Sequence, residues 1–105
     1  MAEIKLSING KNKKFEKKQF FIKEHILALQ FSLKQEKYLE KEDKTIEDIA
    51  ENQKNFAEFI SAVFENQFTP EEFVNGLEIK DKTAAEDIYI DCLGGNNDKE
   101  KKEKQ

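Results

Sequence analysis

Residues 59–77 read F-I-S-A-V-F-E-N-Q-F-T-P-E-E-F-V-N-G-L and carry the strongest local structure signals in the chain. Thr69 is a favoured N-cap residue, Pro70 suits the first position of a helix, and Glu72 stands where a capping box needs an acid. Together these residues predict a short helix over residues 70–76.

Two phenylalanines and a glycine determine how this short helix joins the rest of the chain. Phe68 before the cap and Phe73 after it have the spacing of a hydrophobic staple, which sets the direction from which the chain enters a helix. Gly76 is expected to end the helix, because glycine readily takes the left-handed conformation of a helix terminator.

A longer helix is predicted before this segment, over residues 45–66. Thr45 and Asp48 resemble a capping box with the shorter acid, and apolar residues follow at helical spacing. They are Ile46, Ile49, Phe56, Phe59, Ile60, Val63 and Phe64. We interpret the phenylalanines from Phe56 to Phe73 as core. Nine Phe in 105 residues nevertheless exceed what a small core hides easily, so we expect some to be exposed for a partner.

An amphipathic helix is predicted over residues 22–42. Its apolar positions recur at spacings of four, three and four, which is typical of a helical stripe. They are Ile22, Ile26, Leu29 and Leu33, and the stripe is broadened by Leu27, Phe31 and Tyr38. A polar break at Asp43 and Lys44 separates this helix from the next one.

The N-terminus predicts a β-hairpin over residues 3–18. Residues 3–8 alternate between polar and apolar, as in a half-buried strand. The apolar positions are Ile4, Leu6 and Ile8. Asn9 and Gly10 suit a type I′ turn, and residues 13–18 can return as the partner strand. Because an isolated hairpin is marginal in water, its apolar face should pack on the helices.

The C-terminal part predicts one more helix and a tail. Thr83 and Glu86 repeat the capping-box pattern and open a helix over residues 83–93, which the glycine pair 94–95 ends. Its shared face consists of Ala85, Ile88, Tyr89 and Cys92. Residues 96–105 are entirely polar, and we expect them to be disordered.

These elements predict an α+β, mainly α fold, with an N-terminal β-hairpin, about four helices and a disordered C-terminal tail. A chain of 105 residues is one domain at most, and we expect this domain to occupy residues 1–95. No apolar run reaches the roughly 20 residues of a membrane helix. The N-terminus also lacks the apolar segment of a signal peptide, so the expected location is the cytoplasm.

The charges are unevenly distributed. All 18 cationic side chains are Lys, which removes the forked phosphate contacts that Arg makes. Residues 1–24 hold seven Lys against three acids, residues 25–97 seven against sixteen, and residues 98–105 four against three. A net charge of −4 therefore hides a basic front, an acidic body and a mixed-charge tail.

No catalytic, metal-binding or cofactor-binding constellation is recognisable in the sequence. A nucleophilic pair would have to join His25 with Cys92, each the single residue of its type, and these lie far apart in sequence. One His and one Cys cannot close a zinc site, and a single Cys cannot form an intramolecular disulfide. The sequence therefore disfavours an enzyme.

A basic cluster on the hairpin raises nucleic-acid binding as one alternative function. The cluster comprises Lys11, Lys13, Lys14, Lys17 and Lys18 around Phe15. Lysines interleaved with aromatic residues suit single-stranded nucleic acid, but the acidic body opposes such binding. Lysines also protect an exposed strand edge from pairing. A small protein-interaction or regulatory module is the other alternative.

Residues 59–77 resemble the tail assembly chaperones of long-tailed, non-contractile phages of Gram-positive bacteria. In that family a helix ending in Val-Phe runs into Asn-Gln-Phe-Thr, a short acidic helix and a Gly. The matching residues are Val63, Phe64, Asn66, Gln67, Phe68, Thr69 and Gly76. Glu65 departs from the pattern, since members often have Gly there. The phrase Ile8-Asn9-Gly10-Lys11 and the glycine pair 94–95 extend the likeness to about residues 4–95.

The resemblance implies a non-enzymatic assembly factor without a cofactor, made in the host cell cytoplasm and absent from the mature virion. It implies two partners: the long tape measure protein, which the chaperone keeps soluble, and the tail tube protein, which it recruits. Self-association stays open, and no membrane is involved. Apolar residues in acidic surroundings suit reversible coating of a long helical partner.

The resemblance also implies two translation products that share one N-terminal domain, a short form and a longer frameshifted form. The slippery codons are expected at the glycine pair 94–95 or at the lysine pair 101–102. We therefore expect a longer product whose extension follows one of these pairs.

Overall fold

The computed structural model of the protein describes residues 2–94, and in that part of the chain it confirms the α+β, mainly α fold. In chain order the elements are β1 (Ala2–Ile8), β2 (Lys11–Lys17), α1 (Ile22–Glu40), α2 (Ile46–Val63), α3 (Pro70–Gly76), the 3-10 turn η1 (Ile79–Asp81) and α4 (Lys82–Leu93). The predicted disordered tail over residues 96–105 lies outside the described residues.

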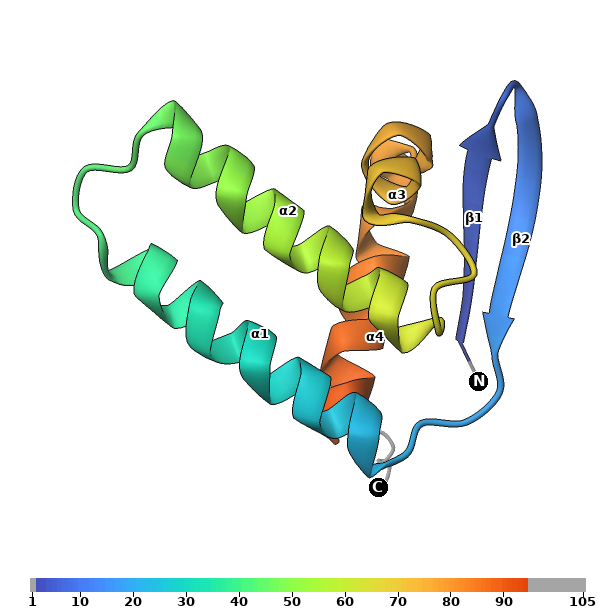
Figure 1. Ribbon diagram of the computed structural model, residues 1–105, viewed down its shortest axis with the longest axis horizontal. Helices are drawn as coiled ribbons and strands as arrows, with labels where there is room; N and C mark the ends of the chain where they lie inside the picture. The colour runs from blue at the N-terminus through green and yellow to red at the C-terminus, as the bar shows by residue number, and fades with distance from the viewer. Residues whose placement is uncertain (1, 95–105) are drawn as a thin grey trace.

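The helices α1 and α2 lie in front of α4, and the hairpin stands at the side of the helices (Figure 1). α1 and α2 run side by side in opposite directions, and α4 crosses behind them. The inner strand β1 packs against α3 and α4, whereas β2 is the outer strand. The hairpin therefore gains the helical support that its sequence requires.

The hairpin confirms the predicted turn. Asn9 and Gly10 have φ angles of 54° and 77°, the positive values that a type I′ turn needs. Ile8 pairs with Lys11 across this two-residue loop, so the return strand begins two residues before the predicted 13–18 range. Ile4 and Leu6 are buried on the inner face, as the alternation predicted.

The core joins β1 to all four helices. It is built from Ala2, Ile4, Leu6, Ala28, Phe31, Ala57, Phe59, Ile60, Val63, Phe64, Phe68, Phe73, Ala85, Ile88 and Cys92. Within this core Phe31 is stacked on Phe59 at 5.7 Å and lies edge-on to Tyr89 at 5.3 Å between ring centroids. Among the exposed large hydrophobic side chains of residues 2–94 the one phenylalanine is Phe21, at 57%, so the expected exposure of phenylalanine is limited to this position.

Two predicted capping boxes are confirmed. The backbone N–H of Thr45 donates to Asp48 at 2.9 Å, and that of Asp48 donates to the Thr45 hydroxyl at 3.1 Å. The same exchange joins Thr69 and Glu72 at 2.9 and 3.0 Å. Each box satisfies backbone donors that a helix start leaves without a partner.

The third predicted capping box is wrong. α4 begins at Lys82, so Thr83 is already helical and its hydroxyl caps nothing. The reason is the preceding turn η1, in which the N–H of Asp81 donates to the carbonyl of Glu78 at 2.9 Å. This bond winds the chain into helical geometry before Thr83 is reached.

Two other helices end earlier than predicted. α1 ends at Glu40 instead of residue 42, because Lys41 is extended. α2 ends at Val63 instead of residue 66, because Glu65 and Asn66 have left-handed φ angles of 57° and 63°. Such a conformation breaks the helical hydrogen-bond ladder.

Gly76 does not act as the predicted left-handed terminator. It is the last residue of α3, and the helix stops at Leu77, whose backbone is extended. A Cβ atom at Gly76 would lie 2.6 Å from the carbonyl oxygen of Ser7 in β1. Glycine is needed here because helix and strand backbones approach closely.

Candidate functional site

The helix α1 carries two apolar faces. The four residues with the predicted spacing form the outer face, whereas Phe31, which was predicted to broaden this stripe, lies on the core-facing side. The core-facing residues Ala28 and Phe31 are 0% and 4% exposed. The predicted stripe is far more open: Ile22 is 72% exposed, Ile26 48%, Leu29 46% and Leu33 64%. We call these four residues the α1 seam. The helical period was predicted correctly, but an amphipathic helix ordinarily buries such a stripe.

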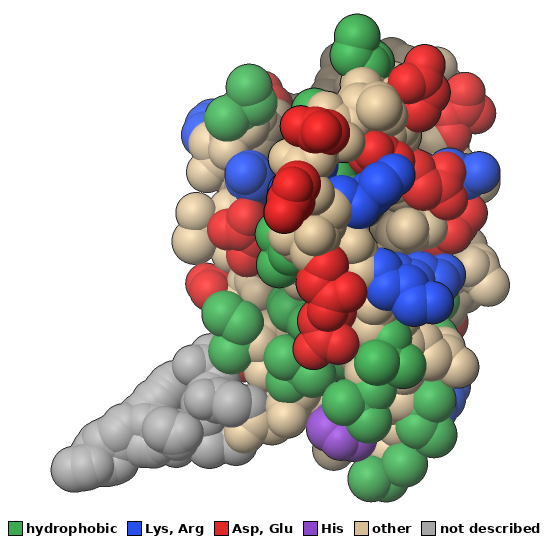
Figure 2. Space-filling model, turned by 90° about the vertical axis from the view of Figure 1, so that its left-hand side faces the viewer, with side chains coloured by type: hydrophobic (Ala, Val, Ile, Leu, Met, Phe, Trp, Pro, Cys, Tyr) green, Lys and Arg blue, Asp and Glu red, His purple; other side chains and the backbone are tan. Residues whose placement is uncertain are grey.

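Close packing explains why the other face is buried. Fully buried Ala28 lets neighbouring helices approach, and Phe31 fills the space that they enclose. By helical periodicity the α1 seam lies on the opposite side of the helix. Figure 2 shows hydrophobic side chains gathered beside the purple histidine, in the lower part of the face turned to the viewer.

Charged residues border the α1 seam unequally. Lys23 and Lys37 lie along one edge of the α1 seam. Each follows a residue with the seam's spacing by one position, Lys23 after Ile22 and Lys37 after Glu36. Glu36 and Glu40 continue the seam's spacing beyond Leu33, and both are exposed. The surface is therefore apolar over three turns, acidic at its C-terminal end and basic along one edge.

A partly buried ion cluster lies at the N-terminal end of α1. The Lys17 ammonium lies 3.0 Å from Glu65 and 3.4 Å from Glu24, a carboxylate with 0% exposure. Lys23 lies 2.9 Å from Glu65. The Lys23 and Lys17 hydrogen bonds lower the pKa of Glu65 to about 2. The hydrogen bond to Glu65 is the main cause that raises the Lys17 pKa.

This cluster changes the reading of the basic hairpin. Lys17 is 9% exposed and forms ion pairs with Glu24 and Glu65, so it does not belong to an accessible basic patch. Lys11, Lys13, Lys14 and Lys18 are exposed, and Lys14 also lies 3.9 Å from Glu16. One of the five predicted lysines is thus structural.

The seven residues of the 59–77 motif build the turn from α2 into α3. Val63, Phe64 and Phe68 are buried, and the Ser61 hydroxyl donates to the Phe68 carbonyl at 2.5 Å. Gln67 donates from its side chain to the carbonyl of Glu16 in β2 at 3.1 Å. The other members are Asn66 in the left-handed turn, Thr69 at the cap and Gly76 against β1.

The structure brings His25 and Cys92 together without forming a nucleophilic pair. Nδ1 of His25 lies 2.8 Å from the backbone oxygen of Cys92. A carbonyl can only accept, so Nδ1 carries the proton. Burial is the main cause that raises the pKa of the Cys92 thiol to about 12, with Glu24 and Asp91 adding to it. The thiol is protonated at neutral pH and therefore a poor nucleophile.

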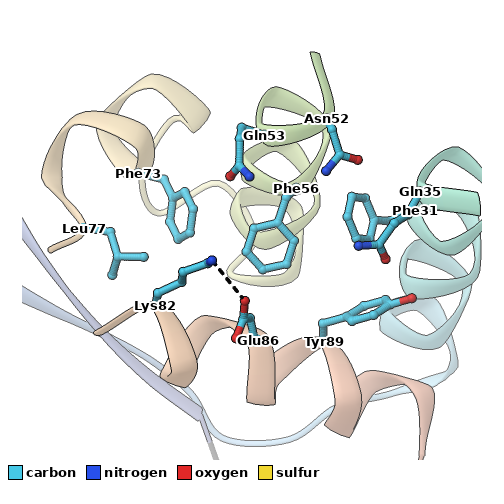
Figure 3. A pocket seen from close by; sticks show the side chains of 10 residues that line it. All are labelled: Phe31, Gln35, Asn52, Gln53, Phe56, Phe73, Leu77, Lys82, Glu86 and Tyr89. Carbon is cyan, nitrogen blue, oxygen red and sulfur yellow. Dashed lines mark ion pairs between the residues drawn. The ribbon is translucent and has the colours of Figure 1, made fainter. Parts of the chain in front are cut away.

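A pocket of about 270 Å³ opens between the four helices (Figure 3). Its apolar wall consists of Phe31, Phe56, Phe73, Leu77 and Tyr89, and polar side chains of Gln35, Asn52, Gln53, Lys82 and Glu86 complete the lining. Lys82 and Glu86 lie 3.7 Å apart across its edge. Sequence reasoning missed this pocket, because its lining residues come from separate segments that only the fold brings together.

One polar atom in this pocket lacks a partner. The Oδ1 atom of Asn52 is buried and accepts no hydrogen bond within the described part of the chain. No group of three His, Cys, Asp or Glu that could hold a metal ion occurs in residues 2–94. Over the same residues, no helix is long and apolar enough to cross a membrane.

Comparison with known proteins gives one match. No curated protein and no solved structure matches the chain significantly. The model of the phage tail chaperone protein family matches residues 1–105. This match covers the hairpin, the four helices and the motif of residues 59–77, in agreement with the resemblance in the sequence. The chain therefore belongs to the phage tail chaperone protein family.

Proposed function

We propose that this protein is a non-enzymatic chaperone that binds the tape measure protein in the host cytoplasm, keeps it soluble and recruits tail tube subunits. The observation that carries the proposal is the family match over residues 1–105. This match supports a role in tail assembly, and the component that we propose the chaperone keeps soluble is the tape measure protein.

The surface of the protein supports this role. Among residues 2–94, eleven large hydrophobic side chains are exposed, from Phe21 in front of α1 to Ile90 in α4. A chain of 105 residues with net charge −4 and 38% charged residues can stay in solution while it presents such groups. Contact with an apolar partner would remove them from water.

Co-expression tests the proposal. The tape measure protein is produced alone or with the tagged chaperone, and its amounts in the soluble fraction and in the affinity eluate are measured. We expect it to be soluble and co-purified only with the chaperone. Addition of tail tube protein to this complex tests recruitment through a second co-purification. A tape measure protein that neither becomes soluble nor co-purifies would contradict the proposal.

A longer frameshifted product is part of the proposal. The coding sequence should contain a slippery heptamer over the glycine pair 94–95 or the lysine pair 101–102, followed by an overlapping frame. Gly95 and the lysine pair lie outside the described residues. Mass spectrometry of the infected host should find peptides that cross from the shared domain into the second frame. A clean stop without an overlapping frame would contradict it.

A further inference from the structure

We propose that the α1 seam docks one amphipathic helix of the partner, and that this helix carries carboxylates beside its own apolar stripe. The proposal rests on the proposed function only for the identity of the partner, the tape measure protein. The chemistry of the docked helix follows from α1 itself.

The α1 seam has the geometry of one half of a helix pair. Spacings of four, three and four are the alternation of heptad positions a and d, at which paired helices meet. Ile22 and Leu29 occupy d, and Ile26 and Leu33 occupy a. The side chains are 46–72% exposed, so within the described residues their outer surfaces have no apolar cover. The seam is about 17 Å long at 1.5 Å per residue.

The charges beside the seam select the partner's chemistry. In this heptad Lys23, Gln30 and Lys37 occupy position e, which faces the flank of a paired helix. Lys37 is exposed and forms no ion pair with any described residue. Lys23 already contacts Glu65 at 2.9 Å, but it is 62% exposed and can reach a second carboxylate. Carboxylates on the docked helix would pair with this basic edge.

A second copy of the chain fits the seam poorly. Antiparallel pairing that sets Ile22 of one copy against Leu33 of the other would bring Lys23 beside Gln30, without an ion pair. Parallel pairing would set Ser32 against Lys37 and His25 against Gln30, without an ion pair. A contact about 17 Å long and one helix wide also falls well short of the roughly 800 Å² per partner of a stable interface.

The C-terminal end of the seam limits how far a helix can dock. Glu36 and Glu40 occupy the next d and a positions and are exposed. An apolar stripe running past Leu33 would bury these carboxylates without partners, which is costly. One chaperone therefore covers about three turns of partner helix. Many copies along a long helix would add their weak contacts.

Fluorescence anisotropy with synthetic helical peptides tests the docking directly. The probe carries Leu and Ile at positions a and d and Glu at e and g, and the comparison peptide carries Lys at e and g. We expect the full chain to bind the Glu peptide at least about fivefold more tightly than the Lys peptide. The double variant Ile26→Ser with Leu33→Ser should lose about tenfold or more in affinity for the Glu peptide.

The matched control is Ile79→Ser. Ile79 is an isoleucine with 90% exposure in η1, away from the seam, so this variant should bind the Glu peptide like the wild type. Circular dichroism of each variant reports whether it is folded. No binding of the Glu peptide to the wild-type chain, equal binding of both peptides, or full binding by the folded double variant would overturn the proposal.

Two further measurements separate this proposal from the proposed function. If the Glu peptide binds but the tape measure protein does not co-purify, helix docking stands and the proposed partner is wrong. If the tape measure protein co-purifies equally with the wild type and the double variant, the partner stands and the seam proposal is overturned. A dimer in sedimentation equilibrium that the double variant abolishes would assign the seam to a second copy and also overturn it.

Discussion

Glu65 shows how a single residue joins three elements of this fold. Its φ of 57° lies in the left-handed region, where glycine is favoured. Its carboxylate contacts Lys17 in β2 and Lys23 in α1 at 3.0 and 2.9 Å. These contacts hold a left-handed turn that a side chain ordinarily disfavours.

Glu65 should make stability depend on pH in the acid range. Its pKa is lowered from the ordinary 4.5 to about 2, chiefly by the Lys23 hydrogen bond. A carboxylate with a lowered folded-state pKa stabilises the protein above its unfolded pKa, and this stabilisation is lost as pH falls to the folded value. Glu65→Gln should therefore be less stable than wild type at neutral pH, and the difference should vanish near pH 2 in urea titrations.

The matched control for this measurement is Glu58→Gln. Glu58 is an exposed acid of α2 that forms no ion pair among the described residues. Its substitution should leave the pH dependence of the unfolding midpoint unchanged. A Glu65→Gln difference that persisted unchanged at about pH 2 would mean that ion pairing is not its source.

Gly76 provides a test of backbone packing. In Gly76→Ala the new Cβ would meet the Ser7 carbonyl oxygen at 2.6 Å, so helix or strand must move. We expect a loss of about 1–3 kcal/mol in the free energy of unfolding, as for other overpacked sites. Val74→Ala, on the exposed side of the same helix, should change it by less than about 0.5 kcal/mol. A neutral Gly76→Ala in urea titrations would contradict the close approach.

At the scale of the element, one face of α1 packs in the core and the other face is exposed to solvent. Phe31 contacts Phe56, Phe59 and Tyr89 at centroid distances of 5.3–5.7 Å. Leu33, two residues further on, is 64% exposed. The two positions therefore differ in what they contribute to stability, although both fall within the same predicted helix.

This difference predicts opposite outcomes for two substitutions. Phe31→Ala should destabilise the protein by about 3–5 kcal/mol, because it leaves a cavity among aromatic rings. Leu33→Ser should change the free energy of unfolding by no more than about 0.5 kcal/mol, because the side chain is already in water. Chemical denaturation followed by circular dichroism measures both. A comparable loss in Leu33→Ser would show that the α1 seam is part of the core.

Local sequence signals predicted where helices and turns form better than they predicted which surfaces of these elements are buried. The hairpin turn at Asn9 and Gly10 and the caps at Thr45 and Thr69 are determined by neighbouring residues, so the sequence alone sufficed. The buried face of α1 depends instead on where α2 and α4 lie. The contact between Gly76 and Ser7 and the pocket between the helices likewise join distant segments. The sequence contained the α1 seam, but its exposure became visible only in the fold.

The molecule as a whole is predicted to unfold in one step. β1 and all four helices contribute residues to one hydrophobic core. Far-ultraviolet circular dichroism reports the helices, and the near-ultraviolet signal reports the packed aromatic side chains, among them Tyr89 against Phe31 and Phe59. Their urea transitions should coincide, as in two-state unfolding. Separate midpoints would indicate that the hairpin or α4 is an independent unit.

The two faces of α1 have a consequence for how such a protein can change over generations. Side chains of the outer face touch little of their own domain, so exchanging one aliphatic residue for another there alters recognition and leaves folding free energy nearly untouched. Most substitutions in proteins are tolerated only while the protein stays stable enough to fold, but substitutions on this helix face change stability little. A chaperone built this way can follow sequence drift in its partner while Glu65, Gly76 and the aromatic core stay as they are.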